Sequence, residues 1–250
     1  ADATDEAFAL LRESIPRLRR LSRQTTLLAC FERLGHERLL PSDLLLAQAR
    51  VYSDLALWER AYLALQLVET IGNEEESWEA HLLHADLLNL QGQTAQAQVV
   101  LNEVDSTRLP PNLQLIYHLT AGRIQIITGA IDDAIVSLEQ ALTLTTSQAD
   151  TVEDPSGLAD IYDNLGLAYA MRGDRPTALR HLKRADACWQ LSGNSGRRAL
   201  TLNNLGMLAS EEGRYAEARS ALEQGLEIAQ QTARRREEIV LRCTMAELDT

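Results

Sequence analysis

Two asparagines set in nearly identical runs are the side chains of this sequence best suited to binding chemistry. Asn164 lies within Asp163-Asn164-Leu165-Gly166, and Asn204 lies within Asn203-Asn204-Leu205-Gly206 further along the chain. An amide side chain both donates and accepts hydrogen bonds, so it can pair with a polar ligand in either sense. Because the two runs are so alike, whatever positions them must be an element that repeats along the chain.

Two histidines have the spacing of metal ligands. His81 and His84 stand three residues apart, which places both imidazoles on one face of a helix. A metal site requires three or four defined ligands, and only Glu79 and Asp86 are near in sequence. Because no pattern fixes further ligands, we interpret the pair as packing residues and expect neither a metal nor another cofactor.

No motif for covalent or phosphate chemistry occurs in the sequence. No Ser or Cys lies in a nucleophile elbow, and the run from Gly193 to Gly196 lacks the Lys-Ser/Thr of a phosphate loop. The acidic residues are spread along helical segments, which is typical of solvated faces. We predict that the chain is not an enzyme. A fragment of a hydrolase or kinase would need a catalytic domain elsewhere in a longer protein.

The element that repeats is marked by alanines. Five key alanines recur at similar intervals along the chain, and each is followed four residues later by Leu. A small residue, Ala or Gly, also stands five and twelve residues before each key alanine. When the units are aligned on these alanines, each of these positions forms a column of similar residues. Because the columns recur in all five units, the pattern is specific although Ala and Leu are common. The key alanines are Ala61, Ala97, Ala134, Ala178 and Ala218.

These columns describe a helical hairpin. The small residue at the turn tolerates positive φ, and the one before it lets the two helices pack closely. The key Ala and its Leu share one face of the second helix. Strand-like alternation is nearly absent, so we predict an all-α fold. The predicted helix pairs are 42–54 with 58–71, 75–91 with 94–105, 111–128 with 131–147, 157–172 with 175–192, and 196–212 with 215–231.

The pattern resembles the tetratricopeptide repeat. Residues 162–169 with Gly173, Ala178 and Ala185 match it best. The Pro that usually ends the second helix is missing. The family's usual period is about 34 residues, and every interval between the key alanines here is longer. The resemblance covers about residues 40–250 and implies a right-handed superhelix, or α-solenoid, of antiparallel helix pairs.

The repeat predicts three parts in the chain. Residues 1–39 hold N-terminal helices, one before Pro16 and one from there to Leu34, which form a cap or the end of a preceding unit. Residues 40–232 form five tetratricopeptide-like hairpins. Residues 233–250 form the first helix of a truncated sixth repeat. We therefore expect this sequence to be a piece of a longer protein.

The resemblance also implies where a ligand binds. In this family the first helices line the concave face, and in peptide-binding members an Asn equivalent to Asn164 and Asn204 often holds the backbone of an extended peptide. The alternative, in which these Asn residues bond neighbouring helices or face water, stays open. The predicted ligand-binding residues of the concave face are Asp160, Asp163, Asn164, Asn203, Asn204, Met207, Glu211 and Arg123.

Charge and hydropathy limit the classes of partner. The net charge is −12, whereas a nucleic-acid-binding domain needs a basic patch. The basic run Arg234–Arg236 is followed at once by two glutamates. No segment has the eighteen apolar residues of a membrane span, and no signal peptide is recognisable. We predict no direct nucleic-acid or membrane partner and a cytoplasmic location.

The Asn-Asn-Leu-Gly run is similar to repeats of kinesin light chains and to the sensor arrays of bacterial signal-transduction ATPases with numerous domains, which include maltose-regulon-activator-like proteins. Long units with irregular linkers favour the second group. We predict a non-catalytic sensor domain of a multidomain bacterial signalling or transcription regulator. It would bind a peptide, protein or small-molecule inducer on the concave face and contact neighbouring domains of the parent chain. The alternative is a passive protein–protein interaction scaffold.

Overall fold

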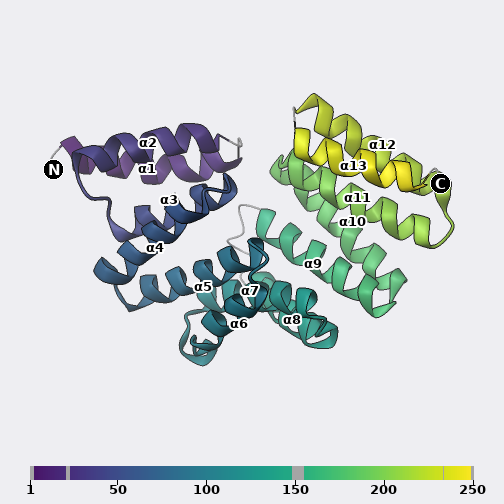
Figure 1. Ribbon diagram of the computed structural model, residues 1–250, viewed down its shortest axis with the longest axis horizontal. Coiled ribbons are helices and arrows are strands. Elements are labelled where there is room, and N and C mark those ends of the chain that lie inside the picture. Colours follow the sequence, from purple (N-terminus) through teal and green to yellow (C-terminus); the bar gives the residue numbers. More distant parts are fainter. Residues whose placement is uncertain (1–2, 21–22, 148–154, 233, 249–250) are drawn as a thin grey trace. The chain divides into compact units, whose positions relative to one another are not determined.

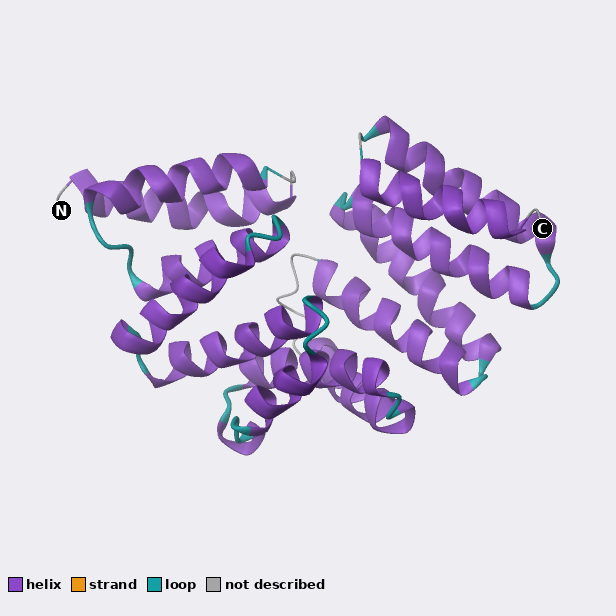
Figure 2. Ribbon diagram, viewed as in Figure 1, coloured by secondary structure: helices purple, strands orange, loops and turns teal. Residues whose placement is uncertain are grey.

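The chain is helical throughout the parts that can be described. The computed structural model describes residues 3–20, 23–147, 155–232 and 234–248, and these ranges contain thirteen α-helices, one turn of 3₁₀ helix and no strand (Figures 1 and 2). The all-α prediction is confirmed. Contacts divide the chain into two compact units, Ala1–Thr128 and Gly129–Thr250. In the described residues no helix is both long and apolar enough to cross a membrane.

The first unit consists of consecutive helices that pack on their neighbours. The most extensive contacts are those of α3 with α4 and of α5 with α6, followed by α4 with α5, and α1 also packs on α2. Its core is built around fully buried side chains such as Phe31, Leu44 and Leu65. The elements are α1 (Ala3–Arg20), α2 (Gln24–Glu37), α3 (Ser42–Asp54), α4 (Trp58–Ile71), α5 (Glu74–Leu90), α6 (Thr94–Asn102), η1 (Ser106–Arg108) and α7 (Pro111–Thr128).

The predicted helix break at Pro16 is wrong. Pro16 lies inside α1, which continues to Arg20, and α2 extends past Leu34 to Glu37. A proline in a helix interior costs about 3 kcal/mol. The helix persists because apolar side chains on both sides of Pro16, Phe8 before it and Leu18 after it, pack into the same core.

The second unit repeats one close approach between helices. A Cβ added to Gly166 of α9 would lie 2.6 Å from Cγ of Leu182 on α10, and one added to Gly206 of α11 would lie 2.7 Å from Cγ of Leu222 on α12. In both pairs the Leu four residues after the key Ala therefore fills the space that the glycine leaves. The helices are α8 (Ile131–Ser147), α9 (Ser156–Arg172), α10 (Arg175–Ser192), α11 (Ser195–Glu211), α12 (Tyr215–Gln231) and α13 (Arg235–Leu248).

The turns between paired helices occur at the small residue that stands five positions before each key alanine, as predicted. Gly173 joins α9 to α10 with φ of 88°, and the equivalent Ala56 joins α3 to α4 with φ of 56°. Ala56 is the only non-glycine with positive φ among the described residues. The observed helices agree with the predicted pairs to within a few residues. The assignment of residues 1–39 to a cap and of 233–250 to a truncated repeat stays a prediction.

Candidate functional site

One face of the second unit carries most of the predicted binding residues. Helices α9 and α11 contact each other, and side chains four residues apart on each share a side of the helix. We call this surface the α9–α11 face and define it by Asp160, Asn164, Leu167 and Met171 on α9, with Asn204, Met207 and Glu211 on α11.

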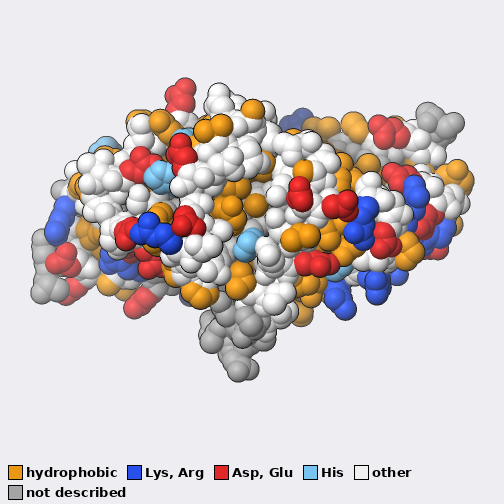
Figure 3. Space-filling model, turned by 90° about the horizontal axis from the view of Figure 1, so that it is seen from below, with side chains coloured by type: hydrophobic (Ala, Val, Ile, Leu, Met, Phe, Trp, Pro, Cys, Tyr) orange, Lys and Arg blue, Asp and Glu red, His pale blue; other side chains and the backbone are white. Residues whose placement is uncertain are grey.

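Large apolar side chains are exposed on the α9–α11 face. Leu167 is 42%, Met171 53% and Met207 44% exposed. Scattered exposed apolar residues are ordinary, as the face of the molecule in Figure 3 illustrates. Here, however, three of them follow one helical register on adjacent helices. Flexible methionines suit a surface that adapts to its ligand.

Three amides beside these apolar side chains have unused hydrogen-bonding capacity. Nδ2 of Asn164 donates to the backbone oxygen of Asp160 at 2.7 Å. Half-buried Asn204 makes no side-chain hydrogen bond with the described part of the chain. Asn203 is 6% exposed; its Nδ2 contacts Sδ of Met207 at 3.4 Å. Its Oδ1 is buried without a partner among the described residues, and a buried unpaired acceptor costs free energy.

The carboxyl of Asp163, by contrast, makes its hydrogen bonds to two of the helices that pack on α9. It accepts hydrogen bonds from Nε1 of Trp189 on α10 at 2.7 Å and from Oγ1 of Thr201 on α11 at 2.8 Å. Burial raises the pKa of Asp163 to about 6, against the opposing effect of these two donors and of Arg197. The carboxyl therefore links α9 to α10 and α11.

The charged members of the predicted site also form ion pairs. Asp160 on α9 accepts from Nη2 of Arg197 on α11 at 2.5 Å. Exposed Glu211 lies 3.5 Å from Nη2 of Arg175 on α10. Arg123 lies on α7 in the first unit, where its Nη1 donates to Asp86 on α5 at 2.9 Å. Arg123 therefore belongs to a different unit from the other seven residues.

The sequence did not indicate several residues of this surface. Trp189, Thr201 and Arg197 tie the helices together, yet none lies in the repeat columns. Met171 could have been found from its helical spacing, four residues after Leu167.

The histidine pair is used in packing. Nδ1 of His81 lies 2.8 Å from the backbone oxygen of Ser77, and its Nε2 is 3.9 Å from Glu69. The ring of His84 lies 5.0 Å from that of Tyr62. No group of three or more potential metal ligands occurs in the described ranges.

Comparison with known proteins agrees with the helical hairpins. Tetratricopeptide-repeat family models match residues 157–231 and 78–103. The chain has the fold of a tetratricopeptide-repeat array. Residues 157–231 include both α9 and α11, so the array includes the α9–α11 face. No curated protein sequence matches the chain significantly.

Solved structures with the same fold are distant in sequence. A signal-transduction ATPase with numerous domains and a tetratricopeptide-repeat sensor, from Pyrococcus horikoshii, is 14% identical with a TM-score of 0.74, over 97% of this chain and 37% of that one. A chain of the APC/C hetero-tetramer Cut9–Hcn1 is 13% identical with a TM-score of 0.72, over 98% of this chain and 46% of that one. A Rap protein complexed with competence and sporulation factor is 17% identical with a TM-score of 0.68, over 90% of this chain and 64% of that one. The array spans less than half of the first two chains, and these similarities concern the fold alone.

Proposed function

We propose that the α9–α11 face binds an extended peptide segment and that the array is the sensor domain of a multidomain signalling regulator. The fold is that of a protein-binding repeat domain. The observation that carries the proposal is Asn204, whose half-buried amide makes no side-chain hydrogen bond with the described residues and which lies on the same face as exposed Met207.

A peptide would complete the hydrogen bonds that the face leaves open. The backbone of an extended peptide presents a donor and an acceptor at each residue, and the side chain of Asn204 can pair with both. Apolar side chains of the peptide would cover Leu167 and Met207. A net hydrogen bond contributes about 0.5–1.5 kcal/mol, so two amides and an apolar contact suit a modest, reversible affinity.

The sensor role rests on the ties between helices. Asp160 and Asp163 connect α9 to α11 through Arg197 and Thr201. A ligand that bridges the same two helices would favour one packing of the pair and bias a neighbouring domain. The similar folds of an ATPase with a repeat sensor and of a Rap protein bound to a factor support this proposal.

The test uses a displayed library of unstructured peptides selected on the whole chain. We expect one group of the selected peptides to lose about three- to tenfold in affinity on Asn204→Ala, as the loss of one or two hydrogen bonds implies. Gln224→Ala is the matched control, because it removes an exposed amide from α12. If no peptide is selected, or if Asn204→Ala and Asn164→Ala bind every peptide as the wild type does, the proposal fails.

A passive scaffold is the second candidate. It predicts that a bound peptide leaves amide hydrogen exchange unchanged beyond the residues it covers. A sensor predicts altered exchange at the ends of α9 and α11 as well. The repeat fold itself favours binding in both cases.

A further inference from the structure

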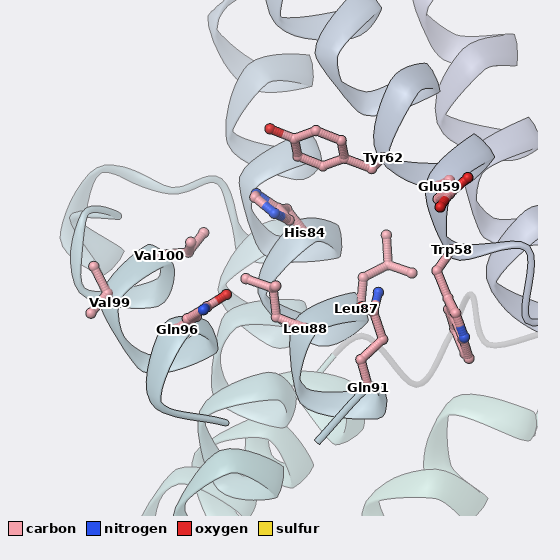
Figure 4. Close-up of a pocket in the computed structure, with 10 residues that line it drawn as sticks. All are labelled: Trp58, Glu59, Tyr62, His84, Leu87, Leu88, Gln91, Gln96, Val99 and Val100. Carbon is pink, nitrogen blue, oxygen red and sulfur yellow. The ribbon is translucent and has the colours of Figure 1, made fainter. Parts of the chain in front are cut away.

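A groove in the first unit lies apart from the α9–α11 face. It has a volume of about 540 Å³ and is bordered by α4 and α6, with α5 forming its floor. Figure 4 shows Tyr62 of α4 on one side of His84 and Leu88, with Val99 and Val100 of α6 on the other. We call it the α4–α6 groove, and its lining residues are Trp58, Glu59, Tyr62, His84, Leu87, Leu88, Gln91, Gln96, Val99 and Val100.

The walls of the groove are apolar and open to solvent. Tyr62 is 42% and Val99 60% exposed, and Leu87 and Leu88 belong to the buried or partly buried core below. The volume is within the range of sites that hold ligand groups, about 300–1,000 Å³. A few large apolar side chains would therefore fill the groove.

The segment that lines the groove accounts for most of the chain's net negative charge. Residues 58–105 contain nine Asp or Glu residues and one Arg, a net charge of −8 out of −12 for the whole chain. The single arginine, Arg60, donates to Glu32 on α2 at 2.9 Å. The segment therefore has no basic side chain facing the groove.

The acidic residues near the groove differ from those on the far side of α5. Glu79 is paired with Arg50, and Asp86 with Arg123. Glu59, which lines the groove, and Glu103 have no ion pair with a Lys or Arg in the described part of the chain. Glu69 has only His81, at 3.9 Å.

Glu69 and Glu103 lie close enough to the groove for their charges to act on one of its lining residues. Both act on the pKa of His84, which lines it. Burial nevertheless lowers the pKa of His84. The imidazole is therefore neutral at pH 7 and does not offset the carboxylates. The groove has an apolar floor with uncompensated negative charge at its edges.

We propose that the α4–α6 groove binds a cationic amphipathic segment of a partner protein. An apolar side chain of that segment lies between Tyr62 and Val99, and its Lys or Arg side chains pair with Glu59, Glu69 and Glu103. Complementary charge at the rim sets the partner and the rate of association, whereas the apolar contact supplies affinity.

The experiment selects peptides from a displayed library on the whole chain and measures the affinity of those enriched. Val99→Lys blocks the groove, and Leu191→Lys on α10 is its control, because Leu191 is 79% exposed. The charge variant is Glu59→Gln/Glu69→Gln/Glu103→Gln. Its control, Glu13→Gln/Glu223→Gln/Glu227→Gln, neutralises as many carboxylates elsewhere.

We expect a second group of enriched peptides, which are basic, carry one or two large apolar residues and do not depend on Asn204. Their affinity falls at least about fivefold in the groove charge variant, as three exposed ion pairs imply, and becomes unmeasurable in Val99→Lys. Both controls and Asn204→Ala bind as the wild type does, which separates this proposal from that for the α9–α11 face. Affinity also decreases with added salt.

Several outcomes overturn the proposal. The control charge variant could weaken binding as much as the groove variant, in which case net charge alone attracts the peptide. Every enriched peptide could be acidic or neutral, or none could be enriched. Sedimentation could show a dimer that Val99→Lys dissociates, which would make a second copy of the chain the occupant.

Discussion

Asp163 illustrates how a single side chain can serve the fold at an electrostatic cost. Its pKa of about 6 exceeds the value of about 3.9 in an unfolded chain. The folded protein therefore binds a proton more tightly than the unfolded one between these two values. As the pH rises from about 4 to about 6, folding stability should decrease, by about 3 kcal/mol at most, and then level off.

The substitution Asp163→Asn should remove this pH dependence. An amide can accept from Nε1 of Trp189 and donate to Oγ1 of Thr201, so the contacts persist without a charge. Urea denaturation at pH 4, 5, 6 and 7 measures the free energy of unfolding. Asp132→Asn, at an exposed carboxyl, should retain the wild-type slope. An equal slope in Asp163→Asn would contradict the assigned role.

At the scale of helices, the spacing between paired elements depends on glycine at one position. Gly166 and Gly206 each face a leucine branch point less than 3 Å from where a Cβ would lie. Cγ of a leucine cannot move away without its backbone or rotamer changing. Overpacking of this kind typically costs about 1–3 kcal/mol, although alanine favours a helix over glycine by about 1 kcal/mol.

The substitution Gly166→Ala should therefore destabilise the array by about 1–2 kcal/mol. Gly157, in the same helix, has open space around the added Cβ, so Gly157→Ala should be neutral or stabilising. The midpoint of urea unfolding compares the two. Stabilisation by both substitutions would show that α9 and α10 separate at little cost.

At the scale of the whole chain, the core is divided into local clusters. One joins Phe8 to Leu87 through α1–α5, and another joins Leu82 to Ile124 through α5–α7. The clusters in the second unit likewise draw on adjacent helices. Repeat arrays of this kind are stabilised by nearest-neighbour contacts.

The substitution Leu65→Ala should reveal this locality. Leu65 is 1% exposed, and truncation of a buried leucine costs about 2–5 kcal/mol. Hydrogen exchange should accelerate in α3, α4 and α5 and remain unchanged in α11 and α12. Uniform acceleration in every helix would show that the two units unfold as one.

The repeat columns predicted the hairpins because each column has a direct steric cause. Gly166 and Leu182 are complementary in shape, and the sequence contains both. The ties of Asp163 could not be predicted, because Trp189 and Thr201 lie 26 and 38 residues away and meet it only when three helices pack. The α4–α6 groove was not predicted for the same reason, because its lining residues come from three helices. Helix α1 continued through Pro16 because tertiary packing outweighed a local signal.

Ala56 occupies a turn position at which the other repeats show which residue is preferred. Its equivalents at four other turns are all glycine, and they share its positive φ. A left-handed alanine costs about 1–2 kcal/mol, part of which glycine loses again as chain entropy. Ala56→Gly should therefore raise the urea midpoint slightly. For protein engineering, the sibling repeats act as an internal consensus, and this turn is where the hairpin of α3 and α4 departs from it.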